Sequence, residues 1–125
     1  MLDHITFGVA DFERATAFYD KALAPLGVGR MMQFDRDGVQ IVGYGEAGKP
    51  YFWLQNAAVT QGPLHVAFAA AGRASVDAFY AAAMAAGGAD NGAPGVRAHY
   101  HPTYYGAFVL DPEGKNIEAV CHTAE

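Results

Sequence analysis

The stretch LDHITFGVADFERATAFY, residues 2–19, has a near copy in LHVAFAAAGRASVDAFYA, residues 64–81. At an offset of 61 residues the matched pairs are His4 and His65, Phe7 and Phe68, Phe18 and Phe79, Tyr19 and Tyr80, and Gly27 and Gly88. Identities held in one register over this length indicate an internal repeat of two copies.

Each copy is expected to begin with a strand and continue as a helix. Side chains alternate along a strand, so His4 and His65 lie on the face opposite the bulky Phe7 and Phe68, among small neighbours. Asp11 is a suitable N-cap for a first helix over 12–26, and a second helix is expected over 75–86.

Shorter strands follow each predicted helix. Residues 30–34 and 39–44 read as a hairpin closed by Asp37-Gly38, and residues 51–55 as the next strand. In the second copy, strands are expected over 97–101, 104–110 and 116–121. The sequence therefore predicts an α+β fold of two tandem βαβββ units, about 1–56 and 63–125, in a single domain over 1–125.

The composition limits the classes of partner. The chain has 125 residues, 52% of them hydrophobic, with a net charge of -5. This acidic balance argues against nucleic acid as a partner, which favours basic patches. No apolar run approaches the roughly 20 residues that cross a bilayer. Cys121 is the single cysteine and the start of the chain does not resemble a secretory signal, so we expect no membrane partner and a cytoplasmic location.

Three side chains predict a metal site. In the last strand Ile117 and Ala119 belong to the helix side, so Glu118 is expected on the face of the two histidines. His4, His65 and Glu118 form a two-histidine, one-carboxylate set that suits a divalent Zn, Ni, Fe, Mn or Co ion. Gln55, interpreted as the counterpart of Glu118 in the first copy, would supply a fourth, neutral ligand.

Aromatic side chains are candidates for substrate binding. Tyr51 and Trp53 are expected on the cavity side of their strand. In RAHYHPTYYGAF, residues 97–108, His101, Tyr104 and Phe108 are expected to line a cleft wall, where an imidazole or phenol can orient a substrate carbonyl or move a proton. The alternative is an aromatic hairpin that is half exposed to water.

Three motifs carry a family resemblance: DHITFGVADFERATAFY, LHVAF and DPEGKNIEAV. With them the chain resembles the vicinal oxygen chelate superfamily, which includes glyoxalase I, bleomycin-resistance proteins and extradiol dioxygenases. The resemblance implies paired units that form a U-shaped, cup-like mixed sheet around a metal cleft. It also implies His4, His65 and Glu118 as ligands, Glu118 as the proton-transfer group and, in glyoxalase I-like members, a cleft between two subunits.

The resemblance leaves three functions open. The first is a small metal-dependent enzyme of lactoylglutathione lyase-like or related lyase or isomerase type, a homodimer acting on a small molecule that chelates the metal through adjacent oxygens. The second is a non-catalytic binding protein of the bleomycin-resistance type, favoured by YFWLQN, which lacks the glutamate expected there. The third is an extradiol-type dioxygenase, which typically carries a tyrosine where this chain has Phe108.

Overall fold

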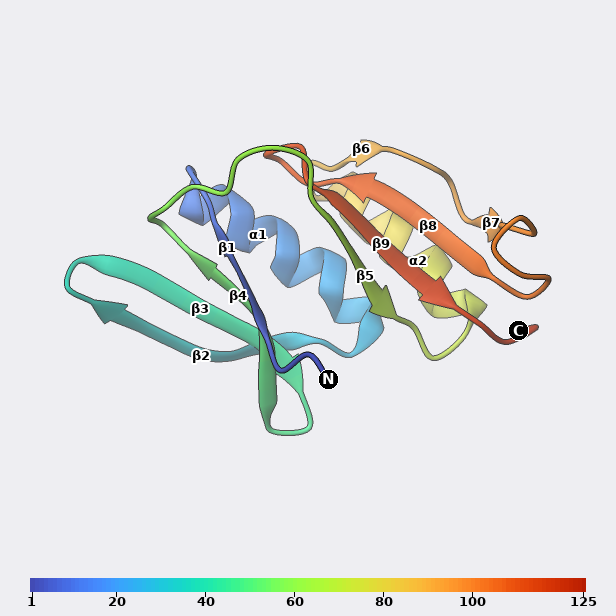
Figure 1. Cartoon of the computed structure of the whole chain (residues 1–125), viewed down its shortest axis with the longest axis horizontal. Coiled ribbons are helices and arrows are strands. Elements are labelled where there is room, and N and C mark those ends of the chain that lie inside the picture. Colours follow the sequence, from blue (N-terminus) through green and yellow to red (C-terminus); the bar gives the residue numbers. More distant parts are fainter.

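The computed structural model describes residues 1–125 (Figure 1). The first copy contains β1 (Ile5–Gly8), α1 (Phe12–Leu23), a 3-10 turn (Ala24–Leu26), β2 (Gly29–Arg36), β3 (Val39–Glu46) and β4 (Lys49–Gln55). The second copy contains β5 (His65–Ala69), α2 (Arg73–Ala85), β6 (Ala89–Asp90), β7 (Gly95–Val96), β8 (Tyr105–Leu110) and β9 (Asn116–Cys121). The predicted α+β class is confirmed.

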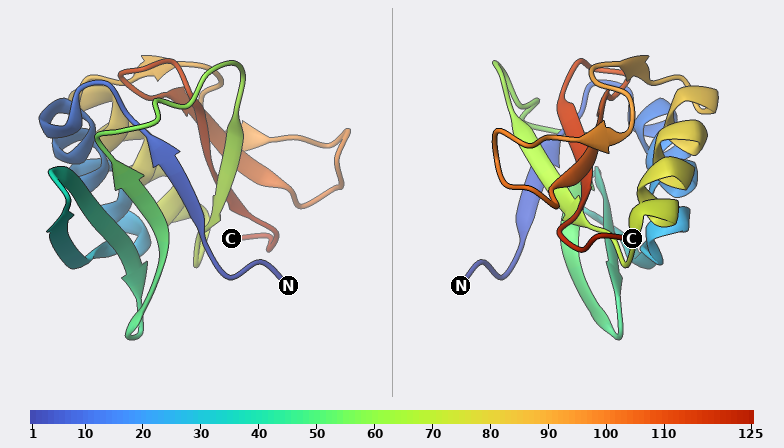
Figure 2. Two further views of the ribbon diagram at one scale, coloured as in Figure 1. Left: turned by 60° about the vertical axis from the view of Figure 1, so that its left-hand side comes forward. Right: turned by 90° about the vertical axis from the view of Figure 1, so that its right-hand side faces the viewer.

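Each copy builds its own sheet. The strand orders are β1-β4-β3-β2 and β5-β9-β8-β6, with β7 also paired to β8. In both sheets the first strand is parallel to the last strand of its copy, β1 to β4 and β5 to β9. Both helices lie on one side of the sheets, which leaves the other side of each sheet open (Figure 2). No helix is both long and apolar enough to span a bilayer.

Aromatic rings join the two copies beneath the helices. The Phe52 ring makes edge contacts with Phe7 at 5.1 Å and with Phe68 at 5.3 Å between ring centroids, and Tyr19 lies at 5.0 Å. All four residues are buried. The alternation expected from the sequence is therefore confirmed: Phe7 and Phe68 face the helices, and the residues beside them face away.

The turn between β8 and β9 is anchored to the first copy. Asp111 accepts hydrogen bonds from the backbone N–H of Lys115 at 2.9 Å and from the hydroxyl of buried Tyr19. Glu113 accepts the backbone N–H groups of Ala10 and Asp11, so its carboxylate lies at the N-terminus of α1, where negative charge is stabilised. These bonds fix the start of the strand that carries Glu118.

The prediction of a strand over 97–101 is wrong. The chain turns there instead: the Tyr100 N–H donates to the Arg97 carbonyl at 2.9 Å, and the Tyr104 N–H donates to the His101 carbonyl at 3.1 Å. Pro102 lacks an N–H for a sheet ladder, which favours this local bonding. The strand pairing of this part of the sheet is made by the short β6 and β7.

Candidate functional site

A histidine and a glutamate meet on the open face of the second sheet. His65 begins β5 and Glu118 lies in β9, and the distance from His65 Nε2 to Glu118 Oε1 is 2.8 Å. The glutamate is only 1% exposed, whereas the histidine side chain is 50% exposed. A buried carboxylate is costly unless it is paired, so this contact stabilises Glu118 and leaves one side of the imidazole toward solvent.

Tyr104 holds the second oxygen of the same carboxylate. Its hydroxyl donates to Glu118 Oε2, and burial followed by this hydrogen bond raises the Tyr104 pKa well above its usual value. Gly106 leaves the necessary room, since a Cβ there would lie 3.1 Å from Glu118 Oε2 and 3.2 Å from Tyr104 Cε1. Both oxygens of Glu118 therefore have partners, each from a different strand or loop.

Phe108 forms a wall beside this pair. Its Cα is the cross-strand partner of Glu118, and its ring lies 5.9 Å from the His65 ring. The guanidinium of Arg97 covers the Phe108 ring at 5.4 Å. The structure thus brings together four residues singled out in the sequence: His65, Tyr104, Phe108 and Glu118.

His101 lies beyond Tyr104, in contact with His122, a residue that the sequence analysis did not single out. His122 directly follows β9, and its Nδ1 is 2.7 Å from His101 Nε2. Both rings lie 5.3 Å from the ring of Tyr104. His122 comes one residue after the last predicted strand. Side-chain alternation was applied only within the predicted strands, so it did not single out this histidine.

The first copy presents a different set on its open face. His4 lies just before β1, with its side chain 55% exposed and its Nδ1 2.7 Å from Asp3 Oδ1. Lys49 also contacts Asp3. The hydrogen bond from Lys49, and to a smaller extent the one from His4, lower the Asp3 pKa. Trp53 lies flat across Gly43, where a Cβ would come within 2.7 Å of the indole.

The strand register corrects the comparison between the two copies. In the second copy Glu118 is paired with Ala67, two residues after His65. In the first copy the residue paired with Thr6, two residues after His4, is Trp53. Trp53 is therefore the counterpart of Glu118, and the equivalence proposed for Gln55 is wrong. Gln55 pairs with Gly8 farther along, and its amide donates to the carbonyl of Ala57 at 3.3 Å.

The four predicted ligands do not form one cluster within the chain. No group of three or more His, Cys, Asp or Glu side chains is placed to hold a metal ion. His65 and Glu118 lie together, while His4 is bonded to Asp3 and lines a different cavity from His65. Within one chain only His65 and Glu118 of the predicted ligands lie together, and this pair is called the half-site below.

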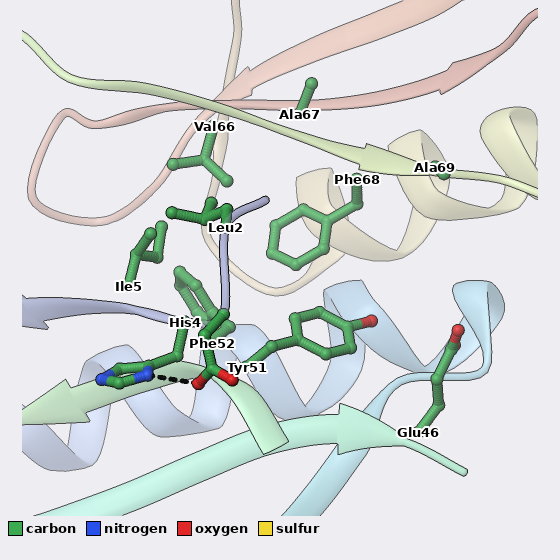
Figure 3. Close-up of a pocket in the computed structure, with 11 residues that line it drawn as sticks. Leu2, His4, Ile5, Glu46, Tyr51, Phe52, Val66, Ala67, Phe68 and Ala69 are labelled. Carbon is green, nitrogen blue, oxygen red and sulfur yellow. Dashed lines mark hydrogen bonds and ion pairs between the residues drawn. The ribbon is translucent and has the colours of Figure 1, made fainter. Parts of the chain in front are cut away.

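An apolar cavity is lined by residues of both β1 and β5 (Figure 3). Its volume is about 280 Å³, and eight of its eleven lining residues are hydrophobic. Val66 and Phe68 contribute from β5, Ile5 from β1 and Tyr51 from β4. Burial and the nearby Glu46 carboxylate raise the pKa of Tyr51 above its usual value.

Solved structures share this architecture. The chain is 30% identical to a glyoxalase/bleomycin resistance protein from Albidiferax ferrireducens T118 over 97% of this chain and 98% of that one, with a TM-score of 0.78. The chain belongs to the glyoxalase/bleomycin resistance protein family. Membership of the vicinal oxygen chelate superfamily, expected from the sequence motifs, is thereby confirmed.

More distant members of this family and its relatives show the fold alone. A glyoxalase/bleomycin resistance protein/dioxygenase family enzyme from Burkholderia phytofirmans PsJN is 20% identical over 97% of this chain and 98% of that one, with a TM-score of 0.72. Glyoxalase I from Zea mays is 18% identical over 99% of this chain and 45% of that one, with a TM-score of 0.70. No protein-family model and no curated protein matches the sequence.

Proposed function

We propose that the protein is a metal-dependent glyoxalase-like enzyme, of lyase or isomerase type, that acts on a small molecule with two adjacent oxygens. The observation that carries the proposal is the half-site of His65 and Glu118, braced by Tyr104. An imidazole nitrogen and a carboxylate oxygen at one point suit a divalent Zn, Ni, Fe, Mn or Co ion. Trp53, Tyr51 and Phe108 would supply apolar walls for the substrate.

We further propose a homodimer in which His4 of a second copy joins His65 and Glu118. Two protein ligands are fewer than such ions usually take, and the exposed His4 lies outside the half-site of its own chain. Gln55 stays a candidate for a further, neutral ligand, because its amide nitrogen donates to Ala57 and this leaves the amide oxygen free. The cytoplasmic location expected from the sequence stays a prediction.

The chain's own groups divide the proposed chemistry among them. When bound, the metal would act as a Lewis acid toward the substrate oxygens. Glu118 takes a proton from the carbon beside a carbonyl and returns it, which is general base and acid catalysis. Tyr104 occupies Oε2, which leaves Oε1, beside His65, as the oxygen that would hold the metal and that would take the proton once released from the ion. Phe108 excludes water from this side of the carboxylate.

The direct test is the metal content of purified protein, measured by mass spectrometry after loading with Ni(II), Zn(II), Mn(II) or Fe(II). We expect stoichiometric metal in the wild type and in His99→Ala, a histidine outside the half-site, and its loss in His65→Ala. Absence of metal from the wild type under every loading condition would contradict the proposal.

Mixing two variants tests the shared site. His4→Ala and His65→Ala should each fail to bind metal alone. If each site uses His4 of one copy and His65 of the other, a mixed dimer regains one intact site, so half of the binding capacity of the mixed dimers returns. A site built within one chain would give no recovery on mixing.

A binding protein is the second candidate, favoured by the apolar cavity and by Trp53 at the position equivalent to Glu118. It would hold an apolar ligand without turnover. In that case the affinity for an apolar fluorescent probe falls in Tyr51→Ala and is unchanged in Glu118→Gln. Loss of a measured turnover in a folded Glu118→Gln variant would instead favour the enzyme.

A further inference from the structure

Two imidazoles meet beyond the half-site, in a group of side chains with no role in the proposed reaction so far. His101 lies in the loop before β8 and His122 follows β9. Their Nε2 and Nδ1 atoms are 2.7 Å apart, and the ring planes differ by 23°. Two rings from distant parts of the sequence are thus held in one geometry.

The bonds around the pair determine which nitrogens carry protons. The backbone N–H of Thr103 donates to His101 Nδ1 at 3.2 Å, and an N–H can only donate. His101 therefore carries its proton on Nε2 and donates it to His122 Nδ1. The Thr103 hydroxyl donates to the His122 carbonyl at 2.6 Å, which ties the same loop to the end of β9.

This proton arrangement argues against a second metal site at the pair. Ligation through His101 Nε2 would move the proton to Nδ1, where the Thr103 N–H already points. No third His, Cys, Asp or Glu completes a cluster with the two histidines. The hydrogen bond between the imidazoles is therefore the structural role of the pair.

The pair packs against the ring of Tyr104. The His101 and His122 rings each approach it edge-on, at interplanar angles of 71° and 90°. Tyr100 covers another side at 4.8 Å between ring centroids. The Tyr104 ring is thus enclosed by three rings, and its hydroxyl meets Glu118 Oε2.

We propose that His101 and His122 are positioning residues that hold Tyr104 on one oxygen of Glu118. With Oε2 occupied in a fixed geometry, Oε1 is the oxygen that faces His65 and the ligand. The role rests on the proposed function for its chemical consequence, but the placement of Tyr104 is a property of the metal-free protein. Groups that orient metal ligands typically change metal affinity by about 10–100-fold when removed.

The test compares two nearly isosteric substitutions of His122. His122→Asn keeps a carbonyl acceptor near the position of Nδ1, and His122→Leu removes it. In metal-free protein, NMR should show the hydrogen-bonded His101 Nε2–H signal and contacts between the Tyr104 ring and the Gly106 Hα protons. We expect both in the wild type and His122→Asn, and neither in His122→Leu. Calorimetry with Ni(II) should show roughly tenfold weaker binding for His122→Leu and rescue in His122→Asn.

The outcomes separate this inference from the proposed function. Unchanged Tyr104–Gly106 contacts in His122→Leu, or equal effects of the two substitutions, would overturn the positioning role. If the wild type binds no Ni(II) while the NMR contacts follow the expected order, the proposed function fails and the positioning of Tyr104 stands. His101→Gln and His101→Leu give the same comparison from the donor side if His122→Leu does not fold.

Discussion

Removal of the Tyr104 hydroxyl should destabilise the protein more than its partial exposure suggests. Tyr104→Phe keeps the ring and deletes the donor to Glu118 Oε2. Because Glu118 is 1% exposed, water does not readily replace that donor. Hydrogen bonds to charged groups contribute about 1.5–3 kcal/mol, and an unsatisfied buried acceptor costs a similar amount. We therefore expect the free energy of unfolding to fall by about 2–3 kcal/mol.

The adjacent tyrosine provides the matched control. On the helix side of the sheet, Tyr105 donates to Asp77 of α2 at 2.7 Å in a hydrogen bond that is exposed to water, so Tyr105→Phe should cost no more than about 0.5 kcal/mol. Urea unfolding at pH 7 measures both variants. At roughly 4 °C per kcal/mol for a domain of this size, Tm should fall by about 10 °C in Tyr104→Phe.

A double-mutant cycle tests the stated cause. Glu118→Leu removes the buried acceptor, and removing both partners of a buried hydrogen bond costs less than removing one. Tyr104→Phe combined with Glu118→Leu should therefore be more stable than the sum of the single effects by about 1–3 kcal/mol. Equal costs for Tyr104→Phe and Tyr105→Phe, or additive effects in the cycle, would refute the reasoning.

Three further predictions concern the core, the open face and alkaline pH. Phe52→Ala deletes the ring between the two copies and should cost about 4 kcal/mol, with both copies still unfolding in one transition followed by circular dichroism. Gly43→Ala should shift the fluorescence of Trp53, the single tryptophan, because a Cβ there would meet the indole, whereas Gly29→Ala meets nothing and should leave it unchanged. Burial raises the Tyr19 pKa, so its contribution to stability is complete below about pH 10 and is lost as the pH rises above that value, by up to about 1.4 kcal/mol per pH unit. The midpoint of urea unfolding should therefore fall less steeply with rising pH in Tyr19→Phe than in the wild type. Equal slopes would contradict this prediction.

Alternation along strands predicted more of the site than any other feature of the sequence. It placed Phe7 and Phe68 toward the helices, and it placed His65 and Glu118 on the open face, where the structure shows them in contact. A period of two residues specifies the face of each side chain with no knowledge of its neighbours.

Side-chain alternation did not predict how the strands pair with one another or where the chain turns. The face of Gln55 follows from alternation, but its position along β1 depends on how β4 pairs with it, and that pairing makes Trp53 the counterpart of Glu118. The segment 97–101 forms a turn because local backbone bonds before and after Pro102 replace a sheet ladder. His122 was missed because it lies beyond the last strand, where no periodic pattern applies.

The equivalence of Trp53 and Glu118 gives the repeat an evolutionary meaning. A duplicated unit begins with two identical copies of every position, and each copy is then free to change under separate selection. Here the position carries a carboxylate in the second copy (Glu118) and an indole in the first (Trp53). In both copies the residue that pairs with it, Ala67 or Thr6, lies two residues after a histidine. The two copies thus keep the same parallel pairing of first and last strands, and they differ chemically at this pair of positions.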